Sequence, residues 1–192
     1  MTRGLVDVRD ATPADAAALQ SIWIDFASRS GRHPRELASL EQIERSVIRL
    51  ETEPAERLVV ATIDGDPVGV AHLRRAPVSP LHDEDAVQVG YLHVLSGFRR
   101  RGVGRHLLEA AVDWADEKGT EHITATAVAA SRDTNRFLAR LGFGQVAVVR
   151  ASTAAALRVK LAAIAAPRDR GRAVATSVVA ARRLRRRGDA SA

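Results

Sequence analysis

The sequence contains no cysteine and few aromatic residues, and both absences limit what the protein can be. Without cysteine there are no disulfides and no cysteine nucleophile, and a metal site would depend on histidine and carboxylate ligands. The lack of thiols fits a reducing compartment. Aromatic residues form 4% of the 192 residues, so stacking on nucleic-acid bases is poorly supported. The six histidines show no spacing typical of a metal cluster.

Long apolar runs are also missing. The N-terminal segment Met1–Asp7 lacks the apolar core of a signal peptide, and no stretch approaches the roughly 18 apolar residues of a membrane span. We therefore expect a cytoplasmic protein with no membrane span. Hydrophobic residues form 46% of the chain, which is enough for one substantial core, and no internal repeat is visible.

The net charge of +6 comes from one end of the chain. From Pro167 onward eight arginines stand against two aspartates, whereas the other 21 basic and 21 acidic residues balance. We therefore divide the chain into a folded domain, residues 1–166, and an Arg-rich tail, residues 167–192, that is helical or disordered. A solvated tail is the simplest interpretation, and contact with nucleic acid or an acidic membrane is the alternative.

The run Phe98–Arg105 is the most informative segment of the chain. It reads Phe-Arg-Arg-Arg-Gly-Val-Gly-Arg and follows an alternating segment, residues 87–94, that predicts a strand. Apolar residues at helical spacing over 103–117, with Gly119 as a stop, predict a helix after it. The glycines let the backbone approach an anion, and the helix N-terminus contributes the positive end of its dipole. The run therefore predicts a phosphate site surrounded by arginines.

Two phosphate-binding motifs do not fit this run. A P-loop would require Lys and Ser or Thr after Gly102, where Val103 and Gly104 stand. A dinucleotide fingerprint would require a small residue at the position of Leu107. What remains is Arg-x-x-Gly-x-Gly, which begins at Arg99.

A second motif follows about thirty residues later. Residues 131–143 read Ser-Arg-Asp-Thr-Asn-Arg-Phe-Leu-Ala-Arg-Leu-Gly-Phe, which predicts a helix that ends in Leu-Gly-Phe. With both motifs in this order, residues 4–162 resemble the GNAT superfamily of N-acetyltransferases. In that family the first motif is the acetyl-CoA signature and the second is a closing helix.

The resemblance implies an α/β fold, a GNAT-like mixed central sheet with flanking helices, and the predicted elements agree with it. Helices are predicted from Thr12-Pro13 onward and over 34–50, 103–117 and 132–141. Strands are predicted over 5–9, 57–63, 68–74, 87–94 and 122–128, followed by a last hairpin over 145–149 and 155–161. The sequence Asp64-Gly65-Asp66-Pro67 is the strongest hairpin-turn signal.

The resemblance also implies acetyl-CoA as co-substrate and assigns residues to it. Leu92 and Val94 would contact the pantetheine arm through their backbone, and the Val94 N–H would polarise the thioester carbonyl. The pyrophosphate would lie on a loop made of Arg99, Arg100, Arg101, Gly102, Val103, Gly104 and Arg105. Ser131, at the start of the closing helix, completes this predicted set. Which arginine contacts which phosphate stays open.

The side chains that this family most often uses for proton transfer are missing. Gln88 stands where many members carry a glutamate base, and Leu138 stands where a tyrosine often protonates the leaving thiolate. Ser131 replaces the usual asparagine, although serine can still cap a helix.

Few candidates for a catalytic side chain remain. Gln88 is one, and Asp85, from the acidic loop before the strand, is another. His93 has a suitable unperturbed pKa, but strand alternation predicts that it faces away from Gln88 and Leu92.

We therefore predict an acetyl-CoA-dependent N-acetyltransferase that moves an acetyl group to an amine by direct attack. The acceptor would be a small-molecule amine or a protein amine, and a homodimer is compatible with the predicted sheet edges. One alternative is a non-catalytic acyl-CoA-binding module, motivated by Gln88 and Leu138. Another is a nucleic-acid-associated protein that acts through its basic tail.

Overall fold

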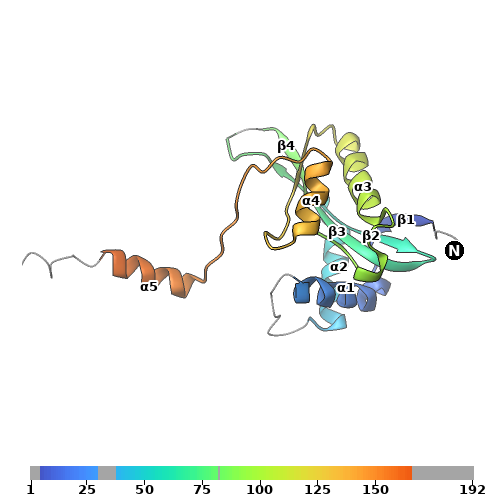
Figure 1. Ribbon diagram of the computed structural model, residues 1–192, viewed down its shortest axis with the longest axis horizontal. Coiled ribbons are helices and arrows are strands. Elements are labelled where there is room, and N and C mark those ends of the chain that lie inside the picture. Colours follow the sequence, from blue (N-terminus) through green and yellow to red (C-terminus); the bar gives the residue numbers. More distant parts are fainter. Residues whose placement is uncertain (1–4, 30–37, 82, 166–192) are drawn as a thin grey trace, which may run out of the picture. The chain divides into compact units, whose positions relative to one another are not determined.

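Figure 1 shows the computed structural model of the chain, which describes residues 5–29, 38–81 and 83–165. Within these residues a five-stranded sheet has the order β1-β2-β3-β4-β5. Its strands are β1 (Val6–Asp10), β2 (Glu56–Ile63), β3 (Asp66–Pro77), β4 (Asp85–Val94) and β5 (His122–Ala125). The pairs β1–β2, β2–β3 and β3–β4 are antiparallel, whereas β5 pairs with β4 in parallel. The predicted mixed sheet is confirmed.

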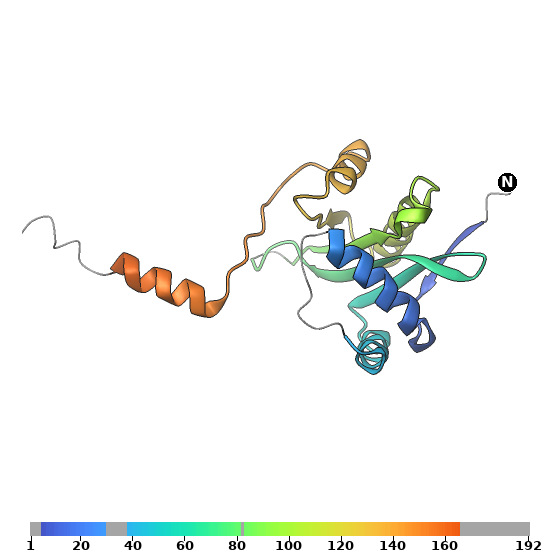
Figure 2. The same cartoon turned by 60° about the horizontal axis from the view of Figure 1, so that its bottom comes forward.

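Helices cover both faces of this sheet (Figure 2). One face carries α1 (Ala16–Arg29) and α2 (Leu40–Glu51), and the other carries α3 (Val103–Glu117) and α4 (Arg132–Arg140). On the α3 face, Leu107 packs in a cluster with Val87 of β4. On the α1 face, Ile22 and Val47 pack in a cluster with Val70 of β3. The sheet therefore separates two apolar cores.

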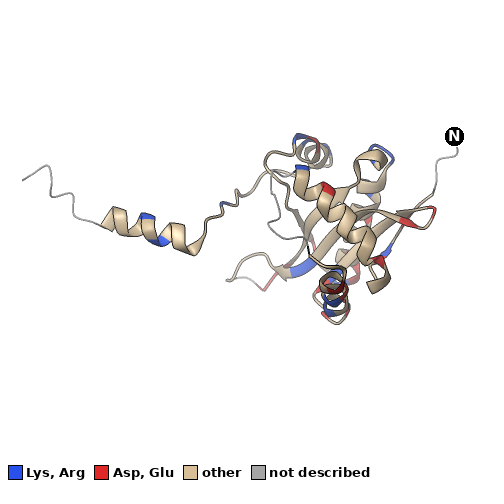
Figure 3. Ribbon diagram, turned by 90° about the horizontal axis from the view of Figure 1, so that it is seen from below, with Lys and Arg blue, Asp and Glu red and all other residues tan. Residues whose placement is uncertain are grey.

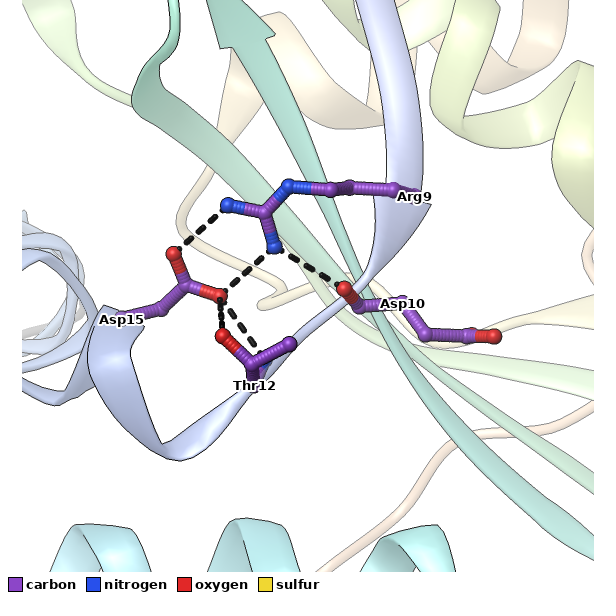
Figure 4. A network of polar contacts seen from close by, with 4 residues as sticks. All are labelled: Arg9, Asp10, Thr12 and Asp15. Atoms are coloured by element: carbon purple, nitrogen blue, oxygen red, sulfur yellow. Dashed lines mark hydrogen bonds and ion pairs between the residues drawn. The ribbon is translucent and has the colours of Figure 1, made fainter.

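A polar network fixes the entry into α1 (Figure 4). Arg9 donates two hydrogen bonds to the Asp15 carboxylate, at 2.7 and 2.8 Å, and the Thr12 N–H donates a third at 2.8 Å. The hydrogen bonds from Arg9 lower the pKa of Asp15 to about 2. Asp15 closes a short 3₁₀ helix, η1 (Pro13–Asp15), so the predicted start at Thr12-Pro13 is a 3₁₀ turn that leads into α1.

Local sequence signals explain two further boundaries. Asp64 and Gly65 both have positive φ, 53° and 90°, as a two-residue hairpin turn of type I′ requires. Helix α2 begins at Leu40, not at residue 34, because Ser39 caps it: the Ser39 hydroxyl accepts the Gln42 N–H, and the Gln42 side chain accepts the Ser39 N–H. Residues 34–37 lie outside the described part of the chain.

The predicted last hairpin is wrong. Residues 145–153 form no regular element, and Ala154–Ala165 form a helix, α5. Alanine and leucine dominate this segment, and their helix propensity prevails over a weak alternating pattern. The compact unit of the sheet ends at Gly144, and α5 belongs to a second unit that begins at Gln145.

Two other features bear on the initial expectations. Among the described residues, no helix combines the length and apolar character needed to cross a membrane. Figure 3 shows acidic and basic residues together on the helices of the sheet unit, in line with the balanced charge of residues 1–166. The Arg-rich tail, residues 167–192, lies outside the described residues.

Candidate active site

The sheet opens between β4 and β5. Strand β5 pairs with β4 from Ala86 to Val89, and the last hydrogen bond joins the Thr126 N–H to the Val89 carbonyl at 2.9 Å. Directly afterwards β4 carries an extra residue relative to β3, and Tyr91 has a φ of 50°. Such a bulge bends a strand and increases its twist. In the described structure, the end of β4 is therefore paired on its β3 side alone.

The backbone of Val94 faces this open edge. The next N–H, that of Leu95, donates to the Val68 carbonyl of β3 at 2.9 Å. Because successive residues of a strand direct their N–H and C=O groups to opposite edges, those of Val94 point away from β3. In agreement, the Val94 carbonyl accepts a hydrogen bond from Nε of Arg99 at 3.0 Å.

A short loop joins this edge to the N-terminus of α3. It contains a 3₁₀ turn, η2 (Ser96–Phe98), and two residues with left-handed backbone, Arg100 at φ 60° and Gly102 at φ 88°. Gly102 caps α3, and its carbonyl accepts the N–H of Arg105 at 2.9 Å. The first N–H groups of the helix, at Val103 and the residue after it, have no intrahelical acceptor and are available to an anion.

The four arginines of this loop differ in their contacts. Arg99 is tied to the Val94 carbonyl, and the Arg101 guanidinium lies 5.3 Å from the centre of the Phe98 ring. Arg105 forms an ion pair with Glu109 on α3, with 3.4 Å between Nε and Oε1. Arg100 is exposed, and its guanidinium makes no ion pair or hydrogen bond with the other described residues. The loop thus offers charge as well as amides.

Helix α4 packs beside the start of α3. A Cβ placed on Gly104 would lie 3.5 Å from the Phe137 ring. Ser131 is the N-cap of α4, but its hydroxyl bonds the Thr134 hydroxyl at 2.8 Å and makes no cap hydrogen bond to the backbone. Serine can cap a helix, but the Ser131 side chain does not cap α4. The Ser131 carbonyl instead accepts the N–H of Asn135 at 3.0 Å.

The bulge also overturns the predicted alternation of β4. Leu92 packs with the α3 cluster, whereas His93 is 8% exposed and contacts Asp25 of α1. The extra residue at Tyr91 shifts the alternation, so His93 lies on the same face as Gln88, and Leu92 lies on the opposite face. Gly90, a glycine inside the predicted strand and directly before Tyr91, is the sequence signal that could have indicated this bulge.

On that face a cluster of side chains adjoins the open edge. The rings of Trp23 and Phe26 from α1 lie 5.6 and 5.9 Å from the ring of Tyr91. Nε2 of His93 lies 2.7 Å from Oδ2 of Asp25. Burial lowers the pKa of His93, although Asp25 opposes this effect. Sequence reasoning missed Asp25 and both α1 rings, because 68 positions separate Asp25 from His93.

The comparison with family models decides the family. The model described as "Acetyltransferase (GNAT) family" matches residues 17–143. The chain belongs to this family. A search of curated proteins found no match.

Solved structures of low sequence identity share the GNAT fold. A transcriptional regulator from Bacillus halodurans C-125 has a TM-score of 0.67 at 21% identity, covering 78% of this chain and 99% of its own. The aminoglycoside N-acetyltransferase AAC(6')-Iy in complex with CoA has a TM-score of 0.62 at 18% identity, and the match covers 78% of this chain and 95% of that one. A ribosomal-protein-alanine N-acetyltransferase from Brucella melitensis biovar Abortus 2308 has a TM-score of 0.63 at 19% identity, and the match covers 78% of this chain and 99% of that one.

The remaining sequence candidates of this GNAT chain lie away from the open edge. Asp85 belongs to β4 itself, is paired with Arg75 at 3.3 Å, and precedes Val94 by roughly 30 Å of extended strand. Gln88 accepts a hydrogen bond from Arg74 at 3.0 Å. Leu138 is buried in the α3 cluster, and its side chain has no ionisable group that could protonate a leaving thiolate. No three His, Asp or Glu side chains converge as metal ligands in the described part of the chain.

Proposed function

We propose that this protein is an acetyl-CoA-dependent N-acetyltransferase that moves the acetyl group to an amine by direct attack, without a covalent enzyme intermediate. One observation carries the proposal: the open edge at Val94 leads directly into a loop that presents helix amides and arginines. An elongated cofactor with a diphosphate at one end and a thioester at the other matches both features. Membership in the acetyltransferase family supports the same reading.

Each part of the loop has a role in this proposal. The amides at Gly102, Val103 and Gly104 bind the pyrophosphate, because they lie at the positive end of the α3 dipole. Arg100 is the arginine best placed to add a charged contact, since the other three already have partners. Ser131 lies at the start of α4, whose Phe137 ring flanks the loop at Gly104.

The thioester end would bind along β4. The pantetheine amides pair with the backbone of Leu92 and Val94, as an added strand would. The Val94 N–H points to the open edge and donates to the acetyl oxygen, where negative charge develops during attack. The Val94 hydrogen bond fixes the position of the thioester carbonyl, so that a bound amine meets it in reactive geometry. The same hydrogen bond stabilises the oxyanion that forms during attack.

The leaving group needs little help. A thiol has a pKa of about 8.5, so its thiolate departs near neutral pH without a strong acid. A buried leucine at position 138 is therefore compatible with transfer. The amine nucleophile makes the greater demand, because an alkylammonium with a pKa near 10 must lose a proton before it attacks.

The acceptor is a small-molecule amine or a protein amine. Structural neighbours include an aminoglycoside N-acetyltransferase and a ribosomal-protein-alanine N-acetyltransferase, so these two acceptor types belong in the first screen. Release of the CoA thiol from acetyl-CoA, followed with a thiol reagent, reports transfer to any amine.

A glycine substitution tests the cofactor site. Gly102→Val should abolish acetyl-CoA binding, because a branched side chain at φ 88° is strained and displaces the loop amides. Gly65→Val is the matched control: Gly65 has φ 90° in the β2–β3 turn, so it carries the same backbone strain far from the loop. Titration calorimetry measures the acetyl-CoA affinity of both variants, and only Gly102→Val should lose it. Full acetyl-CoA affinity in Gly102→Val would refute the assignment.

A second candidate function is a non-catalytic acyl-CoA-binding module. Gln88 and Leu138 favour it, because neither transfers a proton at neutral pH. This alternative predicts acetyl-CoA binding without thiol release across the amine screen. A nucleic-acid role of the tail predicts salt-dependent binding that disappears when residues 167–192 are removed, and binding retained without the tail would refute it.

A further inference from the structure

His93 and Asp25 form a buried pair beside the open edge of β4. Nε2 of His93 lies 2.7 Å from Oδ2 of Asp25, and the side chains are 8% and 24% exposed. Phe26 packs edge-on against the imidazole, with 5.5 Å between ring centroids. Two elements, α1 and β4, therefore fix the plane of this ring.

The hydrogen bond to Asp25 determines which nitrogen of His93 carries the proton. A carboxylate accepts and cannot donate, so Nε2 holds the hydrogen in the neutral ring and Nδ1 keeps a lone pair. Among the described residues Nδ1 makes no hydrogen bond, yet no buried side-chain nitrogen or oxygen lacks a partner. Nδ1 is therefore not fully enclosed, and its lone pair can accept a proton.

Burial, more than the charges around it, favours a neutral His93 ring at pH 7. Asp25 of α1 favours the imidazolium, whereas Arg29 of α1 and Arg99 of the loop after β4 oppose it. The facing residue of β3 is Val70, which carries no charge. Burial has the largest effect and lowers the pKa, so the lone pair of Nδ1 is available at neutral pH.

The reacting centre of the proposed transfer is one residue away. The Val94 N–H, which would hold the acetyl oxygen, belongs to the next residue of β4, about 3.8 Å along the backbone. The His93 side chain lies on the α1 face, whereas the phosphate-binding loop leads into α3 on the other face. An acceptor approaching from the α1 face would meet the thioester beside Nδ1.

An aromatic surface lines that approach. Tyr91 is 49% exposed, and its ring lies 5.6 Å from Trp23 and 5.9 Å from Phe26. Aromatic faces attract ammonium groups and cover apolar bodies. The two carboxylates near these rings, Asp25 and Glu56, are each paired with a histidine, so the surface suits a single positive charge on an apolar group better than a polycation.

We propose that the acceptor is a primary amine on an aromatic or apolar body, bound against Trp23, Phe26 and Tyr91, and that His93, oriented by Asp25, takes its proton. This inference rests on the proposed acetyl transfer and names its acceptor class and its base. His93 is the catalytic residue, and Asp25 is a positioning residue.

The proposed step balances. The amine attacks in its neutral form, after its ammonium has released one proton to solvent. Its lone pair forms the N–C bond, and the proton lost from nitrogen goes to Nδ1 of His93. The C–S bond then breaks with its electron pair on sulfur, and the imidazolium returns its proton to the CoA thiolate. The products are the N-acetyl amine and CoA.

The first test requires no substrate. NMR of the full chain with ¹⁵N-labelled histidine should show His93 as the neutral ring with the hydrogen on Nε2 at pH 7, assigned by comparison with His93→Gln. A His93 ring protonated on Nδ1 at neutral pH would overturn the proposal, because Nδ1 would have no lone pair to offer.

The second test uses 2-phenylethylamine as the acceptor probe and an aminoglycoside as the polycationic comparison. Wild type should release the CoA thiol with 2-phenylethylamine at least tenfold faster than with the aminoglycoside. His93→Gln should lose at least 100-fold in kcat with unchanged acetyl-CoA affinity, as expected for loss of a general base. His122→Gln, which changes a histidine at the start of β5 that is paired with Glu84 and far from Tyr91, is the control and should retain activity.

Asp25→Asn tests whether Asp25 orients the His93 ring through its charge, because asparagine keeps the size of the side chain and removes the carboxylate. It should lower kcat and move the acidic limb of the pH profile to lower pH, because Asp25 raises the pKa of His93. Wild type that binds acetyl-CoA but transfers no acetyl to 2-phenylethylamine, or His93→Gln at full kcat, would overturn this proposal. Failure of wild type to bind acetyl-CoA would instead refute the proposed function.

Discussion

Gly69 of β3 lies where strand, helix and open edge meet, and Gly69→Ala tests that packing. An added Cβ would lie 3.0 Å from Cγ1 of Val103, 3.1 Å from the His93 carbonyl oxygen and 3.3 Å from Cδ1 of Leu107. The carbonyl is backbone and cannot move without shifting β4. Overpacking of this kind costs about 1–3 kcal/mol, and we expect the free energy of unfolding of Gly69→Ala to fall by that amount.

The same clash should weaken the cofactor site. Val103 begins α3, so a displaced Val103 also shifts the amides that would bind the pyrophosphate. We therefore expect weaker acetyl-CoA affinity in Gly69→Ala. Urea unfolding measures the stability change, and calorimetry measures the affinity.

A matched glycine of the same sheet provides the control. A Cβ on Gly90 of β4 would lie 3.9 Å from the nearest atom, the His72 carbonyl oxygen, which is an ordinary contact. Gly90→Ala should leave stability unchanged or raise it slightly, because alanine restricts the unfolded chain. Equal stabilities of Gly69→Ala and wild type would refute the described contact between β3, β4 and α3.

Three further predictions concern single side chains. Asp15→Asn should cost about 2 kcal/mol at pH 7, because the pKa of Asp15 falls from 3.8 to about 2 on folding. That stabilisation is present above pH 4 and is lost as the pH falls toward 2, so acid titration of wild type and variant stability should converge there. Ser39→Ala should lower the free energy of unfolding by about 1 kcal/mol, because the α2 cap is lost. Thermal unfolding measures this change, and an unchanged melting temperature would show that the cap does not stabilise the protein. Gln88→Ala should change turnover far less than Gly102→Val does, and a comparable loss would assign Gln88 a catalytic role.

The segment around the Gly102–Gly104 turn could be predicted from sequence because its signals are local. The predicted helix 103–117 coincides with α3, since Gly102 and Gly119 mark its two ends. The Asp64-Gly65 turn was predictable for the same reason. The helix ends and the turn each require a residue with positive φ, which glycine adopts without strain.

The parts that sequence reasoning missed depend on contacts between distant segments. The bulge at Tyr91 arises from the mismatch of β3 and β4, and strand alternation extrapolated through it placed His93 on the wrong face. The Asp25–His93 pair exists because α1 packs on β4. In the segment 154–165 an alanine-rich sequence fitted both periodicities, and helix propensity decided the outcome.

We propose above that Val94 and the loop from Arg99 to Arg105 bind acetyl-CoA. Titration calorimetry of acetyl-CoA into the purified full-length protein, at moderate salt, tests it most directly. We expect one saturable site with micromolar affinity that is lost in Gly102→Val. An absence of heat at high protein concentration would contradict it and make the Gly102–Gly104 turn a purely structural feature.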